Sequence, residues 1–517
     1  MDIIQEEKEM IDLAQQGLSE FQPFYDAVPD TTLIGEQQTA VGYLMQAKDQ
    51  VLIVEGRAGT GKTTMMKEVV RLIEQSGKRV FVAAPSSEAS RGVLRDEGFD
   101  QAETVAKLLH DKKLHDQLQG QVLWVDEAGL LGVKDMAALL RLTVRVGARL
   151  ILAGDTRQHA SVARGDALRI LRDVAKLPST SLTEIHRQKH AGYKKAIQAI
   201  SKGNVSDGFD TLDQLGYIKS AQGVDYAQVI ASGYVDAMKR GKSALIVSPT
   251  HQQGLAVTTA VRDTLKQKRK IGKKDHHVKQ YIPCNMTDAE KADASNYKTG
   301  HVLQINQNKP GMTRGSVWKV TGAQEKSLLL QDEHSKAISF AVEKEKHFEV
   351  YQETSMPLAK GDLIKITRNG FDHNKKRINN GQALQLVSIN KKGEMTARNP
   401  VSKAEYQLTA DFGHIAHGYC LTSHASQGKT VDEVFIYKPS ATFPATDMKQ
   451  FYVSVSRGRE KAHIYTDDNE ALIGHASRMR DRQSGLELMN LIERGKDLTE
   501  RPEVKPSARQ RRPLYAL

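Results

Sequence analysis

The stretch VLIVEGRAGTGKTTMM, residues 51–66, constrains the fold of this chain more than any other segment. Its first four residues are apolar and predict a buried strand, and the residues from Thr63 onward have the periodicity of a helix. Between them, residues 56–63 match G-x-x-x-x-G-K-[ST], the pattern of a phosphate-binding loop. The glycines of such a loop let backbone N–H groups wrap a phosphate chain at a helix N-terminus. We therefore predict a site for ATP or GTP in a domain where strands alternate with helices.

Two side chains of this loop have specific chemistry. Lys62 is expected to reach the β- and γ-phosphates, and the Thr63 hydroxyl to ligate Mg²⁺. The predicted nucleotide-binding residues of the loop are Gly56, Arg57, Ala58, Gly59, Thr60, Gly61, Lys62, Thr63 and Thr64.

Hydrolysis also needs carboxylates at the metal and at the attacking water, and QVLWVDEAG supplies them at the end of a second apolar strand. Asp126 is expected to hold Mg²⁺, and Glu127 to orient and deprotonate the water. A third apolar strand, residues 149–153, leads into GDTRQ, where the Gln158 amide is a candidate sensor of the γ-phosphate.

A second G-K-T, Gly428-Lys429-Thr430, does not form a second phosphate loop. Such a loop needs a glycine five residues before Gly428, and that position holds Ser423. The preceding residues also differ from a strand-to-glycine turn. We therefore expect a single nucleotide site.

Taken in order, the segments GRAGTGKT, APSS, DEAG, GDTRQ, IHRQ, LTSHASQG and YVSVSRGR resemble the motif series of superfamily 1 DNA helicases. They are most similar to the RecD-like branch, and within it to the helicase part of conjugative relaxase–helicases. The resemblance implies an α/β fold with two RecA-like parallel-sheet motor domains, the second interrupted by a small all-β, SH3-like barrel. It also implies ATP hydrolysis with Mg²⁺ in the cleft between the motor domains, and movement along single-stranded DNA from 5′ to 3′.

The resemblance assigns roles to residues around the nucleotide. Gln37 in LIGEQQTAV is implied to bind the adenine edge, although a Gln at a helix start is usually just solvated. Arg187 in EIHRQ and Arg457 in VSVSRGR match two arginine fingers, which the second motor domain is expected to supply across the cleft. The implied catalytic set is Lys62, Glu127, Gln158, Arg187 and Arg457.

A segment that follows the predicted strand 80–83 is implied to contact DNA through its backbone and hydroxyls. It contains Pro85, Ser86 and Ser87, and without the resemblance a simple turn would explain it equally well. The formal charge of +12 and the pI near 9.3 favour an anionic partner such as nucleic acid.

The segment LTSHASQG explains the second G-K-T. Thr422 and His424 are implied to face the DNA strand, and Gln427 and Gly428 the phosphates of the nucleotide. Lys429 follows this motif and is a further candidate for contact with a DNA phosphate.

Changes of pattern along the chain predict its organisation. From residue 295 to 412, short alternating strands with glycine turns replace the alternation of strands and helices. The predicted segments are 1–30, a lead-in helix and connector; 31–188, motor domain 1; 189–294 and 413–470, motor domain 2; 295–412, the all-β insertion; and 471–517, a helix and a basic tail expected to be disordered. In the insertion, the basic stretch 375–377 is equally consistent with a DNA contact and with a solvated loop.

The element that separates DNA strands in this family is usually an insert before the DEAG strand. Here that region, HDKKLHDQLQG, is very short, so a long pin is absent and weak unwinding is expected. One alternative is therefore a DNA-stimulated ATPase that barely unwinds, and another is a non-catalytic DNA-binding scaffold. RNA as the substrate stays open.

Other features bound the function further. The chain has no apolar run long enough for a membrane span and no secretion signal, and its two cysteines suit a reduced compartment, so we expect a cytoplasmic protein. Asp275-His276-His277 lies in a Lys-rich surface segment and is not expected to bind metal. About 30 residues precede the motor segment, so no DNA-nicking domain is expected. Partners are expected among plasmid-transfer or DNA-processing proteins.

Overall fold

The alternation of apolar strands and helices after residue 50 builds a six-stranded parallel sheet in the order β3-β2-β4-β5-β1-β6. The computed structural model describes residues 3–221, 223–344, 347–479 and 483–493. The strands are β1 (Val51–Gly56), β2 (Val80–Ala84), β3 (Glu103–Thr104), β4 (Val122–Val125), β5 (Arg149–Gly154) and β6 (Ser179–Leu182). Because all strands are parallel, their carboxyl ends meet at one edge of the sheet.

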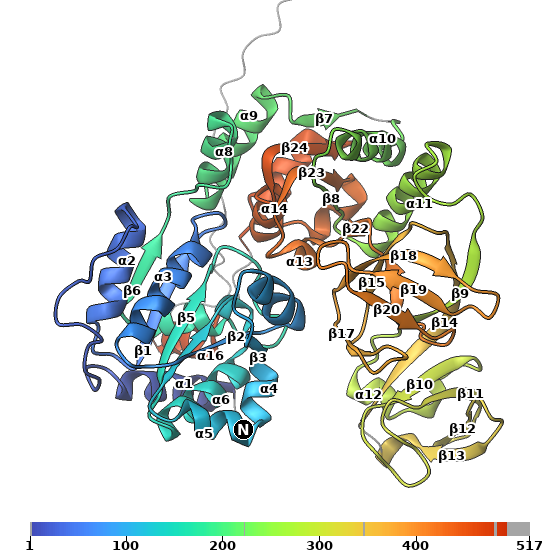
Figure 1. Ribbon diagram of the computed structural model, residues 1–517, viewed down its shortest axis with the longest axis horizontal. Coiled ribbons are helices and arrows are strands. Elements are labelled where there is room, and N and C mark those ends of the chain that lie inside the picture. Colours follow the sequence, from blue (N-terminus) through green and yellow to red (C-terminus); the bar gives the residue numbers. More distant parts are fainter. Residues whose placement is uncertain (1–2, 222, 345–346, 480–482, 494–517) are drawn as a thin grey trace, which may run out of the picture.

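Helices cover this first sheet (Figure 1). They are α1 (Ile3–Gln16), α2 (Gly35–Gln46), α3 (Lys62–Gln75), the π-helix η1 (Glu88–Leu94), α4 (Val105–His110), α5 (Lys112–Leu118), the 3₁₀ turn η2 (Ala128–Leu130), α6 (Val133–Arg145), α7 (Ala167–Arg169) and the π-helix η3 (Ile170–Val174). The predicted pin region thus contains only the short helix α5.

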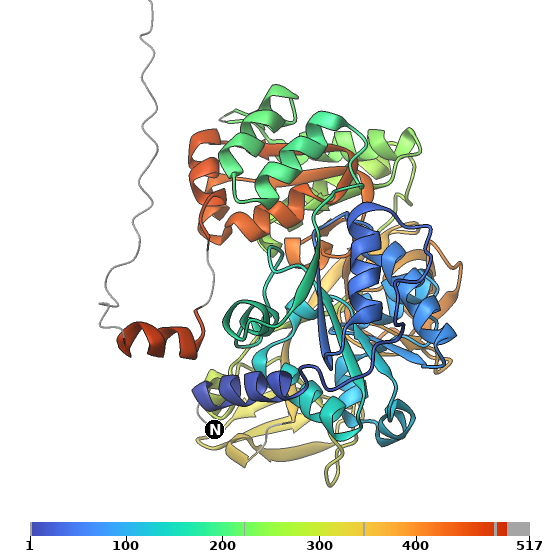
Figure 2. The ribbon, with the colours of Figure 1, turned by 90° about the vertical axis from the view of Figure 1, so that its left-hand side faces the viewer.

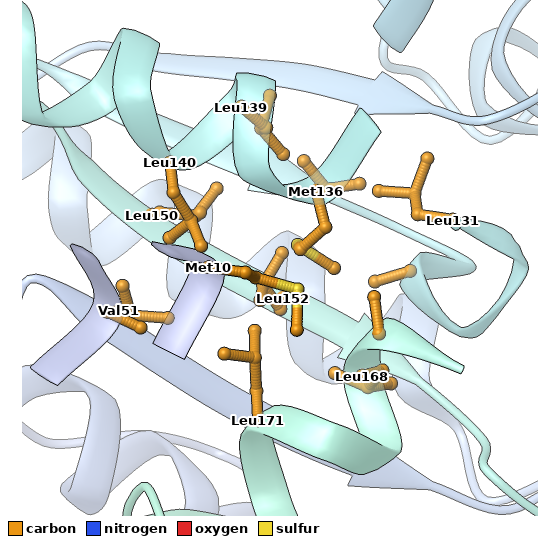
Figure 3. Packing of buried hydrophobic residues seen from close by; sticks show 14 of the residues in the cluster. Met10, Val51, Leu131, Met136, Leu139, Leu140, Leu150, Leu152, Leu168 and Leu171 are labelled. Atoms are coloured by element: carbon orange, nitrogen blue, oxygen red, sulfur yellow. The ribbon is translucent and has the colours of Figure 1, made fainter. Parts of the chain in front are cut away.

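Figure 3 shows the core on one face of this sheet, where Val51, Leu150 and Leu152 of the strands meet Leu140 of α6 and Met10 of α1. All five side chains are at most 2% exposed. Full burial of a side chain of this kind stabilises a fold by about 1.5–3 kcal/mol. Helix α1 therefore belongs to the core of the first domain, so the predicted domain start at residue 31 is too late.

A second parallel sheet has the order β22-β8-β23-β24-β7. Its strands are β7 (Ile218–Ser220), β8 (Ala244–Val247), β22 (Cys420–Leu421), β23 (Val431–Lys438) and β24 (Gly458–Thr466). The helices of this part are α8 (Ala191–Ser201), α9 (Val205–Gln214), α10 (Tyr226–Lys239), α11 (His251–Gln267), α13 (Ser423–Ser426), the 3₁₀ helix η6 (Ser440–Ala445), α14 (Met448–Val455) and α15 (Asn469–Ala476). The predicted α/β fold with parallel sheets is confirmed, and edge strand β7 is a strand that the sequence pattern did not reveal.

The region between β8 and β22 contains two antiparallel sheets, with orders β13-β12-β11-β10-β14-β9 and β20-β19-β18-β15-β21. Their strands are β9 (His276–Pro283), β10 (His301–Ile305), β11 (Val317–Ala323), β12 (Ser327–Gln331), β13 (Ala337–Ala341), β14 (Phe348–Leu358), β15 (Leu363–Ile366), β18 (Ala383–Ile389), β19 (Met395–Arg398), β20 (Glu405–Leu408) and β21 (Ile415–His417). A hairpin, β16 (Gly370–Phe371) with β17 (Arg377–Ile378), and the short helices α12 (Asp288–Lys291), η4 (Ala294–Asn296) and η5 (Val342–Lys344) complete it.

The antiparallel region begins with β9 at His276, before the predicted boundary at 295. The reason is a long-range pairing, since β9 pairs along its length with β14. Nearby, the Asp275 carboxylate pairs with Arg262 and Lys266. The SH3-like barrel stays a prediction.

The helix predicted near the C-terminus is α16 (Gly485–Glu493). It lies next to α1 of the first domain, where the Leu486 N–H donates to the Glu7 carboxylate over 3.1 Å (Figure 2). The predicted basic tail from residue 494 lies outside the described residues. Within the described ranges, every helix is too short or too polar to cross a membrane.

Candidate nucleotide and nucleic-acid site

The phosphate loop connects β1 to α3 and needs its glycines for two reasons. Gly59 and Gly61 have φ values of 83° and 76°, in the left-handed region that favours glycine. A Cβ on Gly59 would lie 2.6 Å from the Cβ of Arg187, and one on Gly61 would collide with the Gln37 amide. The loop is therefore shaped by backbone conformation and by close neighbours on both sides.

Lys62 follows this loop at the start of α3, and its stem crosses the place that a Cβ on Gly56 would fill. Its Nζ is buried and makes no hydrogen bond to any described residue. A buried ammonium without an acceptor is costly, so the site is arranged for an anionic ligand. The residues present thus fit the phosphates of a nucleotide.

The other predicted loop residues have local roles. The Thr60 hydroxyl donates to the Arg57 carbonyl over 2.9 Å, and the Arg57 guanidinium donates to Ser201 of α8 over 3.1 Å. Thr63 is half-buried in the first turn of α3, whereas Thr64 is exposed. The contact of either threonine with a nucleotide or its metal stays a prediction.

Asp126 and Glu127 lie directly after the end of β4, which is the neighbour of β5 in the sheet. Burial and the neighbouring Glu127 raise the pKa of Asp126 to about 6, against the attraction of Lys62. Glu127 has a φ of 52°, a strained conformation for a residue with a side chain, and its carboxylate accepts a hydrogen bond from Gln427 over 3.0 Å. Carboxyl oxygens of this kind are the ligands that a divalent cation such as Mg²⁺ prefers.

Gln158 lies beyond the end of β5 and is 3% exposed. Its Nε2 donates to the Asp155 carboxylate over 2.8 Å. Burial raises the pKa of Asp155, while Lys62 opposes the shift. The predicted sensor is therefore held by a buried carboxyl group close to the phosphate loop.

Arg187 was expected to come from the second motor domain, but it lies in the segment that connects the two domains. Its segment follows β6 of the first sheet, and the backbone N–H groups of His186 and Arg187 donate to the Gly59 carbonyl over 2.7 and 3.2 Å. The Arg187 guanidinium reaches the second domain, where it donates to the Ser456 carbonyl over 2.9 Å. The connecting segment, and not the second sheet, thus supplies this arginine.

Arg457 comes from the second domain and is 1% exposed. Its guanidinium donates to the carbonyls of Val453 and Lys429 and to the Ser456 hydroxyl. Burial lowers the pKa of Arg187 to about 9, and Arg457 adds repulsion; burial also lowers the pKa of Arg457. The structure therefore brings two buried guanidinium groups together beside the phosphate loop.

Two contacts at this junction were missed by the sequence analysis. The Tyr452 hydroxyl of α14 accepts a hydrogen bond from the Ala58 N–H of the phosphate loop over 3.1 Å. The Gln188 amide donates to the Gly458 carbonyl over 2.8 Å. In the sequence, Gln188 and Tyr452 have no pattern of their own. The only signal was that each lies close to a predicted arginine finger, Arg187 or Arg457.

Gln37, in the first turn of α2, lies on the other side of the loop. Its Nε2 donates to the carbonyls of Thr60 and Gly61 over 3.1 and 3.3 Å. Its amide is thus part of the loop support, and its predicted contact with adenine stays a prediction.

The first of the two predicted DNA-binding segments lies after β2. Pro85 and Ser87 are half-buried and Ser86 is exposed, with its hydroxyl accepting from the Ala89 N–H at the start of η1 over 3.0 Å. The segment thus presents both backbone and hydroxyl groups near the surface.

The second segment lies at α13. The Thr422 hydroxyl caps this helix, and the His424 ring stacks on His159 of the first domain with centroids 3.7 Å apart. Gln427 reaches Glu127, while Gly428 is exposed with a φ of 80°. The segment therefore spans from the carboxylates to the surface, and His424 contacts the other domain as well.

Two families of known proteins match parts of the chain. Residues 32–223 match the family described as AAA domain, and residues 417–465 match the UvrD-like helicase C-terminal domain.

Individual relatives match as well. The conjugal transfer protein TraA of Agrobacterium fabrum is 32% identical over 173 residues, which are 33% of this chain and 16% of TraA. The multifunctional conjugation protein TraI of Escherichia coli K12 is 20% identical over 526 residues, covering 90% of this chain and 29% of TraI. The ATP-dependent RecD2 DNA helicase of Deinococcus radiodurans is 34% identical over 180 residues, covering 34% of this chain and 24% of RecD2.

These matches confirm the resemblance to RecD-like superfamily 1 helicases and to conjugation proteins. The chain spans 16%, 29% and 24% of the lengths of TraA, TraI and RecD2. The two family matches cover the phosphate loop and the segment at α13, respectively.

Proposed function

We propose that this relative of the RecD-like superfamily 1 helicases is a motor that hydrolyses ATP and moves along single-stranded DNA from 5′ to 3′. One observation carries the proposal: the unpartnered Lys62 ammonium and the buried guanidinium groups of Arg187 and Arg457 gather around a glycine-rich loop. Three cations in this arrangement are suited to the charge of a triphosphate that is being cleaved.

The proposed roles follow from the contacts of each side chain. Lys62 would bind the terminal phosphates, and Thr63 and Asp126 would hold Mg²⁺, which supplies neutralising charge there. Glu127, which already accepts a hydrogen bond from Gln427 of the second domain, would orient and deprotonate the water.

Coupling between the two domains would use the same groups. Arg457 belongs to the second domain, so its approach to the phosphates depends on closure of the cleft. The Tyr452 hydroxyl on the loop and the His424 ring on His159 are further contacts that would form and break with closure. Because both predicted DNA segments border this cleft, changes at the nucleotide would alter the grip on the strand.

A second function, a DNA-stimulated ATPase with weak or no unwinding, is favoured by one observation. The region in which this family carries its strand-separating element is here only the helix Lys112–Leu118 with its flanking turns. Movement along one strand needs no such element, whereas separation of a duplex does.

The biological setting is also a proposal. TraA and TraI are described as conjugation proteins, which favours plasmid-transfer or other DNA-processing proteins as partners in the cytoplasm. A non-catalytic DNA-binding scaffold is the alternative, and the intact set of Lys62, Glu127 and Arg457 argues against it.

The test combines hydrolysis, unwinding and displacement. ATP hydrolysis is measured with and without a DNA oligomer, with Lys62→Ala as the control for background. Duplexes with a 5′ tail, a 3′ tail or no tail are then offered, and streptavidin is placed on biotin at either end of a single strand.

Unwinding only from the 5′ tail supports the motor and its polarity. Streptavidin removal without unwinding supports the weakly unwinding ATPase. Activity only from the 3′ tail contradicts the polarity. A chain that binds DNA without any stimulated hydrolysis or displacement would refute the motor and leave the scaffold.

A further inference from the structure

Glu88 lies where the two predicted DNA-binding segments meet. It follows Pro85, Ser86 and Ser87 directly and begins the π-helix η1. Its carboxylate forms an ion pair with Lys429, the residue after Gly428 in the second G-K-T. The lysine that was a candidate for a DNA phosphate is therefore neutralised by a carboxylate from the other domain.

The antiparallel insertion reaches the same carboxylate. Gly381, in the turn after β17, has a φ of 88°, and a Cβ there would collide with the Glu88 carboxylate. Lys365 of β15 is half-buried nearby; burial lowers its pKa, the charge of Glu88 opposes the shift, and Lys429 adds to it. Three parts of the chain thus meet at Glu88, and we call this place the three-part junction: Glu88, Lys365, Gly381 and Lys429.

Positive charge continues along the border between η1 and the insertion. Arg91 of η1 and Arg95, which follows η1, both pair with Glu103, over 2.5 and 3.1 Å. Arg377 of β17 lies close enough to Arg91 for the repulsion between them to lower its pKa, after the larger effect of burial. The border therefore carries cations on both sides, and Glu103 already pairs with Arg91, Arg95 and Lys107.

The cations along this border are suited to bind the phosphates of a nucleic-acid strand. At Lys429, the Glu88 carboxylate already occupies the place that a phosphate would take. Lys429 forms an ion pair with the Glu88 carboxylate, and Lys365 of another element lies close enough to feel the charge of both. A backbone phosphate of a single strand carries the same charge as a carboxylate and presents oxygens in the same way. Since Glu88 adjoins Ser86 and Ser87, a strand bound there would place phosphates close to this carboxylate and would be repelled by it.

We propose that Glu88 occupies the position of a DNA backbone phosphate in the resting protein, and that the strand displaces it from Lys429. Glu88 is then an affinity-determining residue: it closes the three-part junction without DNA and keeps binding weak enough for release at each step. The inference rests on the proposed function, because it assumes that single-stranded DNA is the ligand.

The test is fluorescence anisotropy of a labelled oligo(dT) at several salt concentrations, with the full chain and its Glu88→Gln variant. The variant is expected to bind about two- to fivefold more tightly, the range of one exposed or half-exposed charge pair. The slope of log affinity against log salt is expected to change by less than about 1, because the strand neutralises the same number of phosphates once it has displaced Glu88. Glu97→Gln removes the same charge from an exposed ion pair with Lys67 and is expected to change neither quantity.

A second variant separates competition from a merely structural contact. If Glu88 competes with DNA for Lys429, the gain of Glu88→Gln should vanish in a Lys429→Met background. Equal or weaker binding by Glu88→Gln, or a gain that persists without Lys429, would overturn the proposal while leaving the motor intact. Failure of the unchanged protein to bind the oligomer would overturn both.

Discussion

Replacement of Asp126 by Asn is expected to stabilise the metal-free protein while it abolishes ATP hydrolysis. Burial and the adjacent Glu127 raise the pKa of Asp126 from its ordinary value of 3.8 to about 6. The folded protein thus binds a proton at this carboxyl more tightly than the unfolded chain does. This tighter proton binding adds to the free energy of unfolding. The added stability is fully present below pH 3.8 and is lost as the pH rises through about 6.

The magnitude follows from the same pKa values. At about 1.4 kcal/mol for each pH unit, the span from 3.8 to about 6 corresponds to about 3 kcal/mol lost at neutral pH. The Asn side chain cannot ionise and avoids this loss. The part of this loss that develops between pH 5 and neutral pH is about 1–2 kcal/mol, or roughly 2–8 °C in the unfolding midpoint of a domain of this size.

The assay is thermal unfolding in EDTA at pH 5 and pH 7.5, for the unchanged protein, Asp126→Asn and Asp100→Asn. Asp100 is exposed in a turn of the same domain and controls for the loss of one charge. The midpoint of Asp126→Asn should exceed that of the unchanged protein, and the gap should widen at pH 7.5. A variant that unfolds at the same or a lower temperature at pH 7.5 would refute this reasoning about the carboxyl pair.

Three other substitutions test separate parts of the structure. Arg457→Ala should lower DNA-stimulated kcat about 10³-fold or more in a steady-state ATPase assay, the effect of losing an arginine finger; an unchanged kcat would contradict its role. Tyr452→Phe removes the acceptor of the Ala58 N–H, and a buried N–H without a partner costs about 1–3 kcal/mol. Hydrogen exchange at Ala58 should therefore accelerate, and equal protection in both proteins would argue against this contact. Arg262→Ala leaves the fully buried carboxylate of Asp362 without its ion-pair partner, and urea denaturation should show a loss of about 3–5 kcal/mol. A loss within the error of the extrapolation would count against a structural role for this pair.

The phosphate loop could be predicted from sequence because its requirements are local. The strand, the turn glycines and Lys62 are within sixteen consecutive residues, and each is needed by backbone conformation or charge. Asp126 was predictable for a related reason, since an apolar strand that ends in carboxylates can place them only at the edge of the sheet.

Other features could not be predicted because they depend on which segments meet. Nothing around Tyr452 in FYVSV shows that its hydroxyl reaches Ala58, and nothing around Glu88 shows that Lys429 neutralises it. The early start of the antiparallel region depends likewise on the pairing of β9 with β14. These contacts join residues far apart in the chain, and short-range periodicity carries no information about them.

By itself, the sequence determined the chemical groups of this protein: one glycine-rich loop, its lysine, two carboxylates and two arginines in a fixed order. It also determined the local strands and helices that carry them, since these depend on neighbouring residues. Only the tertiary structure decided that Arg187 binds to the loop from the connecting segment, that the guanidinium groups of Arg187 and Arg457 lie together beside the phosphate loop, and that a carboxylate pairs with the lysine of the second G-K-T. Convergence of charges is a property of packing, because the energies that favour or oppose it depend on burial and distance after the chain has folded.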